Sequence, residues 1–213
     1  MLDLSFSCLD MVPEEHAAAP TLLARLRIAE HTGADVRTIA LRCQLRIEPG
    51  RRRYSSREAD RLVDLFGDRS QWSGTVHPMQ LALVSHLVPA FRDQIETTIA
   101  VPCTYDMEVA CGKYFASLDD GEVPITILFS GMAFLDGSGG FRSEPIPWHH
   151  EAAHRLPVTV WREMIDRQFP NQGWLRLRRD TIGELRAFAA AEAIVDTDAV
   201  VERLLKEAGW PPR

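Results

Sequence analysis

Three residues in the stretch WHHEAAH have the types and spacing of a zinc site. His150, Glu151 and His154 form an H-E-x-x-H motif. On a helix, positions i and i+4 lie on one face, so two imidazoles with this spacing can bind a single zinc ion. The glutamate between them can deprotonate a metal-bound water. One interpretation of the sequence is therefore a zinc-dependent hydrolase with this motif as its metal site.

The flanking residues argue against that interpretation. Pro147 and Pro157 each lie three residues outside the two histidines. Because the residue before a proline disfavours the α conformation, a helix here is confined to about nine residues. No G-x-x-H follows at the spacing of the metzincins, although Glu163 or Glu184 could supply a third ligand. We therefore favour a polar, partly exposed surface turn, and we expect no cofactor.

The four cysteines are scattered along the chain: Cys8, Cys43, Cys103 and Cys111. They form no C-x-x-C pair, so the sequence has neither a zinc knuckle nor a thioredoxin-like motif. Unpaired cysteine is commonly a small core residue, so we expect buried thiols. The alternative is a thiolate site that, together with the histidine cluster, would make the protein a metal-carrying chaperone.

Five arginines lie around a turn in the stretch RIEPGRRRYSSRE: Arg57 and four candidates for partner binding, Arg46, Arg51, Arg52 and Arg53. They could form a docking patch for an acidic partner or a phosphate. They could also form a solvated loop in which the arginines pair with Glu48, Glu58 and Asp60, because surface ion pairs are common and individually weak. Both interpretations remain open from the sequence.

Aromatic and glycine-rich stretches add candidates for contacts but no catalytic machinery. Trp210, near the end of the chain, is a candidate for an exposed partner contact, whereas Trp148 and Trp161 are expected to hold helices onto the sheet. Residues 136–141 have no lysine and lack a strand–G-x-G-x-x-G–helix context, so we expect a hairpin turn. No Ser-His-Asp order or nucleophile elbow is present. The sequence favours a non-enzymatic protein that binds a partner protein.

Composition restricts the class of partner. The chain has 213 residues, of which 46% are hydrophobic and 25% charged, as in ordinary soluble globular proteins. The net charge of −6 argues against nucleic acid, because a phosphate-binding surface usually needs an excess of Lys and Arg. No apolar run approaches the roughly 20 residues that span a bilayer, and the N-terminal residues lack the basic start of a secretory signal. We expect a cytoplasmic protein without membrane insertion.

Alternating polarity predicts strands in the first two thirds of the chain. The clearest alternation places five apolar residues on one face: Ile39, Leu41, Cys43, Leu45 and Ile47. Arg42, Gln44 and Arg46 should then face solvent or a partner. Residues 2–6 and 21–28 alternate similarly, and further strands are expected in 79–89, 95–103 and 123–135, the last of them central.

Helical spacing dominates the rest of the chain. Short helices are expected within residues 55–67 and 106–121, and longer ones within 157–169, 180–195 and 196–209. We predict one α+β domain over residues 1–213, sheet-rich in 1–148 and helix-rich in 157–209. Its core should be an antiparallel β-sheet or sandwich, with inserted short helices and C-terminal helices.

Three stretches together, residues 41–67, 101–134 and 146–177, resemble an uncharacterised bacterial protein family of about this length that has no assigned activity. Genes of that family often lie in clusters that encode nickel-iron hydrogenases and their maturation factors. The resemblance therefore implies an accessory role in hydrogenase assembly or maturation, with a hydrogenase-related protein as partner. The residues that recur in the family are framework residues such as Phe129-Ser130-Gly131 and Trp161, and the two motif histidines are not among them.

Overall fold

The computed structural model describes residues 2–103, 105–137, 140–170 and 177–210. The chain divides into two compact units, Met1–Gln172 and Gly173–Arg213. The sequence predicts a single domain over residues 1–213. The last two helices, which pack on one another as described below, belong to the second unit.

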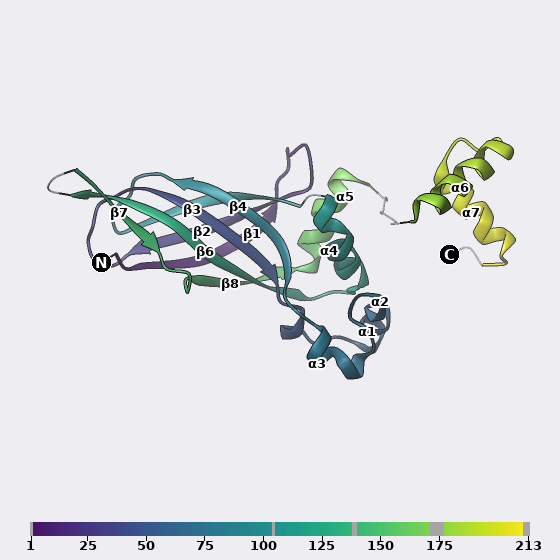
Figure 1. Cartoon of the computed structure of the whole chain (residues 1–213), viewed down its shortest axis with the longest axis horizontal. Helices are drawn as coiled ribbons and strands as arrows, with labels where there is room; N and C mark the ends of the chain where they lie inside the picture. The colour runs from purple at the N-terminus through teal and green to yellow at the C-terminus, as the bar shows by residue number, and fades with distance from the viewer. Residues whose placement is uncertain (1, 104, 138–139, 171–176, 211–213) are drawn as a thin grey trace. The chain divides into compact units, whose positions relative to one another are not determined.

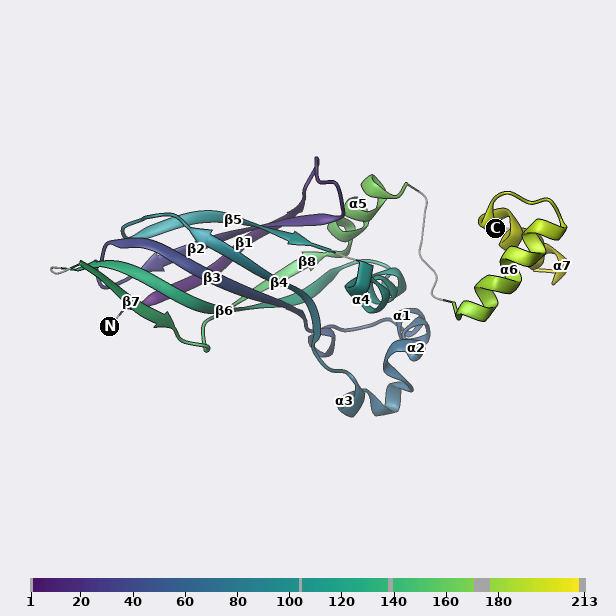
Figure 2. The same ribbon diagram turned by 45° about the horizontal axis from the view of Figure 1, so that its top comes forward.

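The first unit is built on two antiparallel sheets (Figure 1). The strands are β1 (Leu4–Pro13), β2 (Thr21–Glu30), β3 (Val36–Ile47), β4 (Met79–Val88), β5 (Gln94–Pro102), β6 (Glu122–Gly137), β7 (Gly140–Ile146) and β8 (Glu151–Pro157). One sheet has the order β1-β2-β5, and the other has the order β4-β3-β6-β7, with β8 also paired to β6. The turned view in Figure 2 shows the same two layers of strands. The predicted α+β fold with an antiparallel sandwich is confirmed.

The core lies between the two sheets. Phe6 of β1 stacks on Phe129 of β6, with ring centroids 4.4 Å apart, so the inner faces are in direct contact. The five apolar residues predicted for the inner face of β3 are all buried, each at most 2% exposed. Arg42 is exposed on the opposite face. Period-two alternation alone was therefore sufficient to orient this strand.

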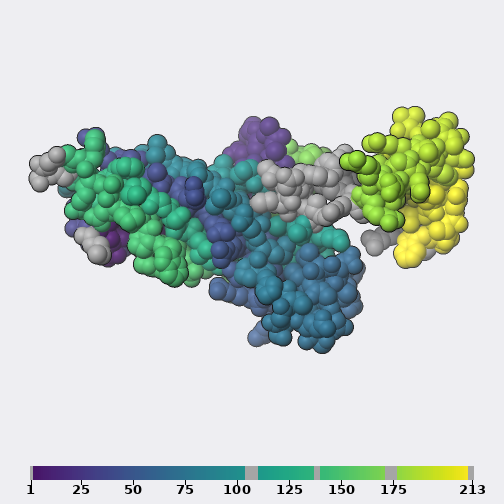
Figure 3. All heavy atoms as spheres, viewed as in Figure 1, coloured from purple at the N-terminus to yellow at the C-terminus, as the bar shows by residue number. Residues whose placement is uncertain are grey.

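Helices cover one end of the sandwich. A short 3-10 turn (Pro49–Arg51), α1 (Ser56–Arg61), α2 (Val63–Phe66), a second 3-10 turn (Arg69–Gln71) and α3 (Trp72–Thr75) lie between β3 and β4. α4 (Tyr105–Ser117) precedes β6, and α5 (Val158–Gln168) follows β8. In the space-filling view the segment that contains α1 to α3 forms a blue lobe of the surface (Figure 3).

Two aromatic predictions have opposite outcomes. Trp161 of α5 is 4% exposed, belongs to the hydrophobic core together with residues of the sheets, and stacks on Phe115 of α4 with centroids 4.1 Å apart, so it holds α5 onto the core as expected. The same expectation for Trp148 is wrong, because this side chain is 85% exposed in a turn before β8. A large apolar residue beside prolines gives no sign in the sequence of which way it points.

The second unit contains two helices, α6 (Arg179–Ala191) and α7 (Thr197–Glu207). The helices contact each other, and Arg203 of α7 forms an ion pair with Glu192 at 2.8 Å. Val200 is the one buried residue in the part of this unit that the structure describes, and Trp210 is 67% exposed, as predicted. In the described residues of both units, no helix is long and apolar enough to cross a membrane.

Candidate binding surface

The H-E-x-x-H motif does not lie on a helix. Trp148 and His149 form the expected turn, but the chain then enters β8, which pairs with the first half of β6. The predicted helix or turn over residues 151–154 is therefore wrong. The physical reason is an alternation of two faces: Ala152 and Leu156 are buried and His154 is partly buried, whereas Ala153 and Arg155 are exposed. This short strand pattern fits the free edge of β6, and pairing with β6 stabilises the extended conformation.

The strand separates the two motif histidines. Four residues of strand span about 13 Å, whereas four residues of helix rise only about 6 Å. His150 lies beside Phe6 and His149, and burial and the neighbouring imidazole lower its pKa. Burial also lowers the pKa of His154, against the opposing fields of Asp10 and Glu122. Within the described residues no three His, Cys, Asp or Glu side chains converge to hold a metal ion.

The cysteines occupy core positions in different elements. Cys43 on β3, Cys103 after β5 and Cys111 on α4 are buried, and Cys8 on β1 is partly buried. Burial raises the pKa of Cys43 to about 12 and that of Cys111 to about 11, so these two thiols are protonated at neutral pH. The thiolate cluster that a metal-carrying chaperone would need is absent from the described part of the chain.

The four clustered arginines do not form one surface. Arg52 turns inward and pairs with Glu58 at 3.0 Å, with only 8% and 6% of the two side chains exposed. Its guanidinium also donates to the backbone carbonyls of Asp120 and Glu122, where the chain enters β6. The charge of Arg52 is thus used inside the protein, as the alternative of pairing with Glu58 anticipated.

The neighbours of Arg52 have different surroundings. Arg51 and Arg53 are exposed, and neither forms an ion pair with any described residue. Arg46 is half-buried on the outer face of β3, where it donates to Gln44 at 3.0 Å. Trp210 belongs to the second unit. Within the first unit, the structure therefore does not bring the four arginines together as one patch.

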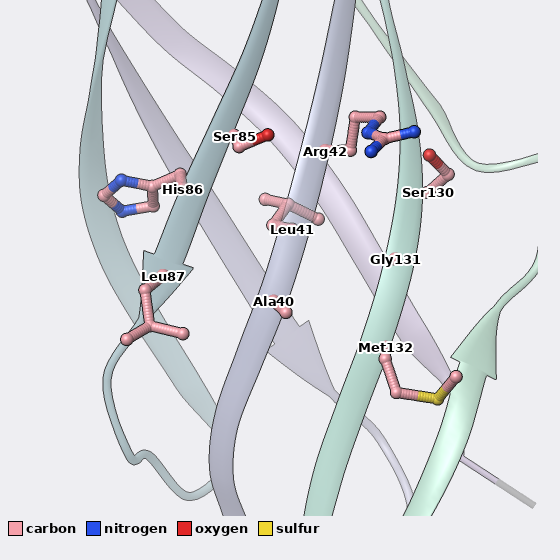
Figure 4. A pocket seen from close by; sticks show the side chains of 9 residues that line it. All are labelled: Ala40, Leu41, Arg42, Ser85, His86, Leu87, Ser130, Gly131 and Met132. Carbon is pink, nitrogen blue, oxygen red and sulfur yellow. The ribbon is translucent and has the colours of Figure 1, made fainter.

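A hollow of about 640 Å³ lies on the outer face of the larger sheet (Figure 4). It is formed by three strand segments that are far apart in the sequence: residues 40–42 of β3, 85–87 of β4 and 130–132 of β6. Sequence reasoning oriented β3 correctly but could not find this hollow, because its shape depends on which residues of β4 and β6 stand beside β3.

The strand register arranges the outward side chains of this hollow in rows. Arg42 pairs with Ser85 on one side and Ser130 on the other, which gives a polar row across three strands. Ala40 pairs with Leu87 and Met132, which gives an apolar row beside it. Figure 4 shows the Arg42 side chain extending from β3 toward β6, on the side where Ser130 lies.

A second apolar row lies on the other side of the polar row. Here Gln44 pairs with Leu83 on β4 and Leu128 on β6. Leu87 and Leu83 are 68% and 58% exposed. Met132 is at 36%. The outer face of an antiparallel sheet is usually polar, so large apolar side chains on both sides of an arginine are unusual.

The polar row has no internal partner. Within the described part of the chain the side chains of Arg42, Ser85 and Ser130 form no hydrogen bond or ion pair, and no carboxylate lines the hollow. His86 points away from the hollow in Figure 4 and lies within hydrogen-bond distance of Thr97 on β5, at 2.7 Å. The arrangement offers hydrogen-bond donors and apolar contacts, which suits binding.

Gly131 sets the floor of the hollow. Its φ of +143° lies in a region that L side chains rarely adopt, and a Cβ at this position would collide with the carbonyl oxygen of Ala40 on β3. The glycine therefore lets β3 and β6 approach each other. A residue with a side chain would not fit between the backbones of β3 and β6 at this position.

Comparison with curated proteins gives no match. The match to beta-glucosidase 3B from Thermotoga neapolitana, solved with alpha-D-glucose, covers 72% of this chain and 17% of that enzyme, at 11% identity and a TM-score of 0.27. The GH3 beta-glucosidase of Bifidobacterium adolescentis matches 86% of this chain and 20% of its own, at 9% identity and a TM-score of 0.27. The match to the beta-glucosidase of Kluyveromyces marxianus covers 72% of this chain and 15% of that enzyme, at 5% identity and a TM-score of 0.26.

This chain spans a fifth or less of the length of each of these enzymes, and at such TM-scores the similarity assigns neither fold nor activity. The comparison with protein families covers nearly the whole chain, residues 1–211. The chain belongs to the Family of unknown function (DUF6084).

Proposed function

We propose that this protein is a non-catalytic accessory protein that binds a partner protein through the outer face of its larger sheet. The observation that carries this proposal is the hollow around Arg42. The guanidinium there has no partner among the described residues and lies between two rows that contain exposed apolar side chains. Exposed apolar residues grouped around a hollow are typical of interaction sites. Arginine is among the residue types that contribute most to binding at such interfaces, and methionine is also enriched there.

The partner we propose is a component of a nickel-iron hydrogenase or of its maturation machinery, in the cytoplasm. This part of the proposal rests on the resemblance to a family whose genes often lie beside hydrogenase genes. An accessory role in assembly fits a protein in which the described residues offer a binding face rather than a metal site.

The test is affinity purification from the organism that encodes the protein, grown so that the hydrogenase genes are expressed. Wild type should recover a hydrogenase subunit or maturation factor, identified by mass spectrometry. Leu87→Asp should recover much less, because the substitution places a charge in the apolar row of an exposed strand without affecting the core. Val63→Asp is the matched control, since Val63 is 50% exposed on α2, away from the hollow.

Two outcomes would count against the proposal. Recovery of no hydrogenase component by wild type would exclude the named partner. Equal recovery by wild type and Leu87→Asp, with Leu87→Asp shown to be folded by its thermal melt, would exclude the outer face of the sheet as the binding surface.

A further inference from the structure

We infer that the hollow recognises a carboxylate on an extended segment of the partner protein, flanked on the same face of that segment by apolar side chains. The inference rests on the proposed function and deepens it, because it names the chemistry of the partner segment. It follows from the hydrogen-bond donors in the polar row, from the spacing of the rows, and from the absence of a carboxylate among the described residues that line the hollow.

The polar row is rich in hydrogen-bond donors. The guanidinium of Arg42 has five N–H donors and no acceptor, and the hydroxyls of Ser85 and Ser130 can each donate one more hydrogen bond. None of these donors is used by a described residue. A carboxylate offers two oxygens whose geometry matches a guanidinium fork, and such charge-assisted bonds are about twice as strong as neutral ones. The polar row therefore complements a carboxylate.

The spacing of the rows determines the pattern of the partner segment. Adjacent rows are separated by two residues along β3, which corresponds to about 6.6–6.8 Å. In an extended segment laid along β3, side chains at positions i−2, i and i+2 point to one face with the same separation. A segment with the pattern apolar-x-acid-x-apolar would thus place its acid over Arg42 and its apolar side chains over the Leu87 and Leu83 rows.

The apolar rows favour a protein carboxylate over a simple anion. A phosphate or sulfate ion would pair with Arg42 but would leave the exposed leucines in water. A peptide segment covers both kinds of row and removes apolar surface from water, which favours binding. The net charge of −6 also disfavours a polyanion such as nucleic acid.

The test uses two fluorescein-labelled peptides with blocked ends. One has the core Leu-Thr-Glu-Thr-Leu and the other has Gln in place of Glu. Binding to the full chain is measured by fluorescence anisotropy at low ionic strength. We expect the Glu peptide to bind roughly tenfold more tightly or better, because a hydrogen bond to a charged group contributes about 1.5–3 kcal/mol. That preference should disappear in Arg42→Ala and should weaken as salt is raised.

Arg53→Ala is the matched control, because Arg53 is also exposed and unpaired among the described residues but lies outside the hollow. It should bind both peptides as wild type does. Equal binding of the two peptides, no binding of the Glu peptide at millimolar concentration, or an equal loss in Arg53→Ala would each overturn the inference.

The outcome can be separated from that of the proposed function. If the hydrogenase component is retained by Arg42→Ala but lost in Leu87→Asp, the binding face is right and the carboxylate inference is wrong. If the Glu peptide binds selectively but no hydrogenase component is recovered by wild type, the carboxylate inference is supported and the proposed partner is wrong.

Discussion

Replacing Arg52 by methionine should destabilise the first unit strongly. The guanidinium donates to Glu58 at 3.0 and 3.1 Å and to the carbonyl oxygen of Glu122 at 3.2 Å. The Glu58 carboxylate also accepts from the backbone N–H groups of Ser55 and Asp119, at 2.9 and 3.0 Å. Arg52→Met keeps much of the stem but leaves a buried carboxylate without its cation.

The magnitude follows from the burial of the pair. Removing one partner of a buried ion pair costs about 3–5 kcal/mol, because the remaining charge is left uncompensated in a poorly hydrated site. Both side chains here are less than a tenth exposed, so solvent does little to replace the missing partner. For a protein of this size 1 kcal/mol shifts Tm by roughly 2–4 °C, so the expected decrease in Tm is about 6–20 °C.

The assay is thermal unfolding followed by near-ultraviolet circular dichroism, with urea titration to obtain the free energy of unfolding. Arg53→Met is the control, since this neighbouring arginine is exposed and should change stability by about 0.5 kcal/mol or less. An unchanged Tm in Arg52→Met, or an equal decrease in both variants, would refute the structural role of Arg52 and favour the docking role that the sequence left open.

Three further predictions concern the sheet and its histidines. Leu45→Ala, at a fully buried position, should cost about 2–5 kcal/mol in urea titrations, whereas Arg46→Ala on the other face should cost little, and equal losses would show that β3 is oriented wrongly. Gly131→Ala should cost at least about 2 kcal/mol, because the new Cβ strains the backbone and meets the carbonyl of Ala40, and a wild-type melt would contradict that geometry. Burial lowers the pKa of His154 in the folded protein below 6.5, so the unfolded chain binds the proton more tightly. The contribution of His154 to the free energy of unfolding should therefore be complete above pH 6.5 and be lost as the pH decreases through the folded-state pKa. His154→Asn should flatten the dependence of Tm on pH in this range, and an unchanged slope would exclude this histidine as its source.

The orientation of the strands could be predicted from the sequence because it depends on local alternation. Ile39, Leu41 and Leu45 can be buried together only if Arg42 faces outward, and this holds whichever strands stand beside β3. The same argument places the apolar residues of β2 inside. Helix positions were likewise indicated by local signals, such as the serine at position 55 that caps α1 through a reciprocal hydrogen-bond pair with Glu58.

The role of individual side chains depended on contacts between distant segments. Arg51, Arg52 and Arg53 are identical in type and adjacent, yet only Arg52 reaches the chain at residues 120–122, about seventy positions away in the sequence. The H-E-x-x-H spacing fits a helix locally, but the free edge of β6 selects a strand for residues 151–157.

The candidate binding surface shows the same division. Alternation in the sequence already turned Arg42 outward, but nothing near it in the chain identifies Ser85, Ser130 or Leu87 as its neighbours. Those neighbours are set by the register of β4 and β6 against β3. Register is a property of pairing between strands that are tens of residues apart. Alternation therefore determined which face each residue occupies, and only the tertiary structure decided which residues share it.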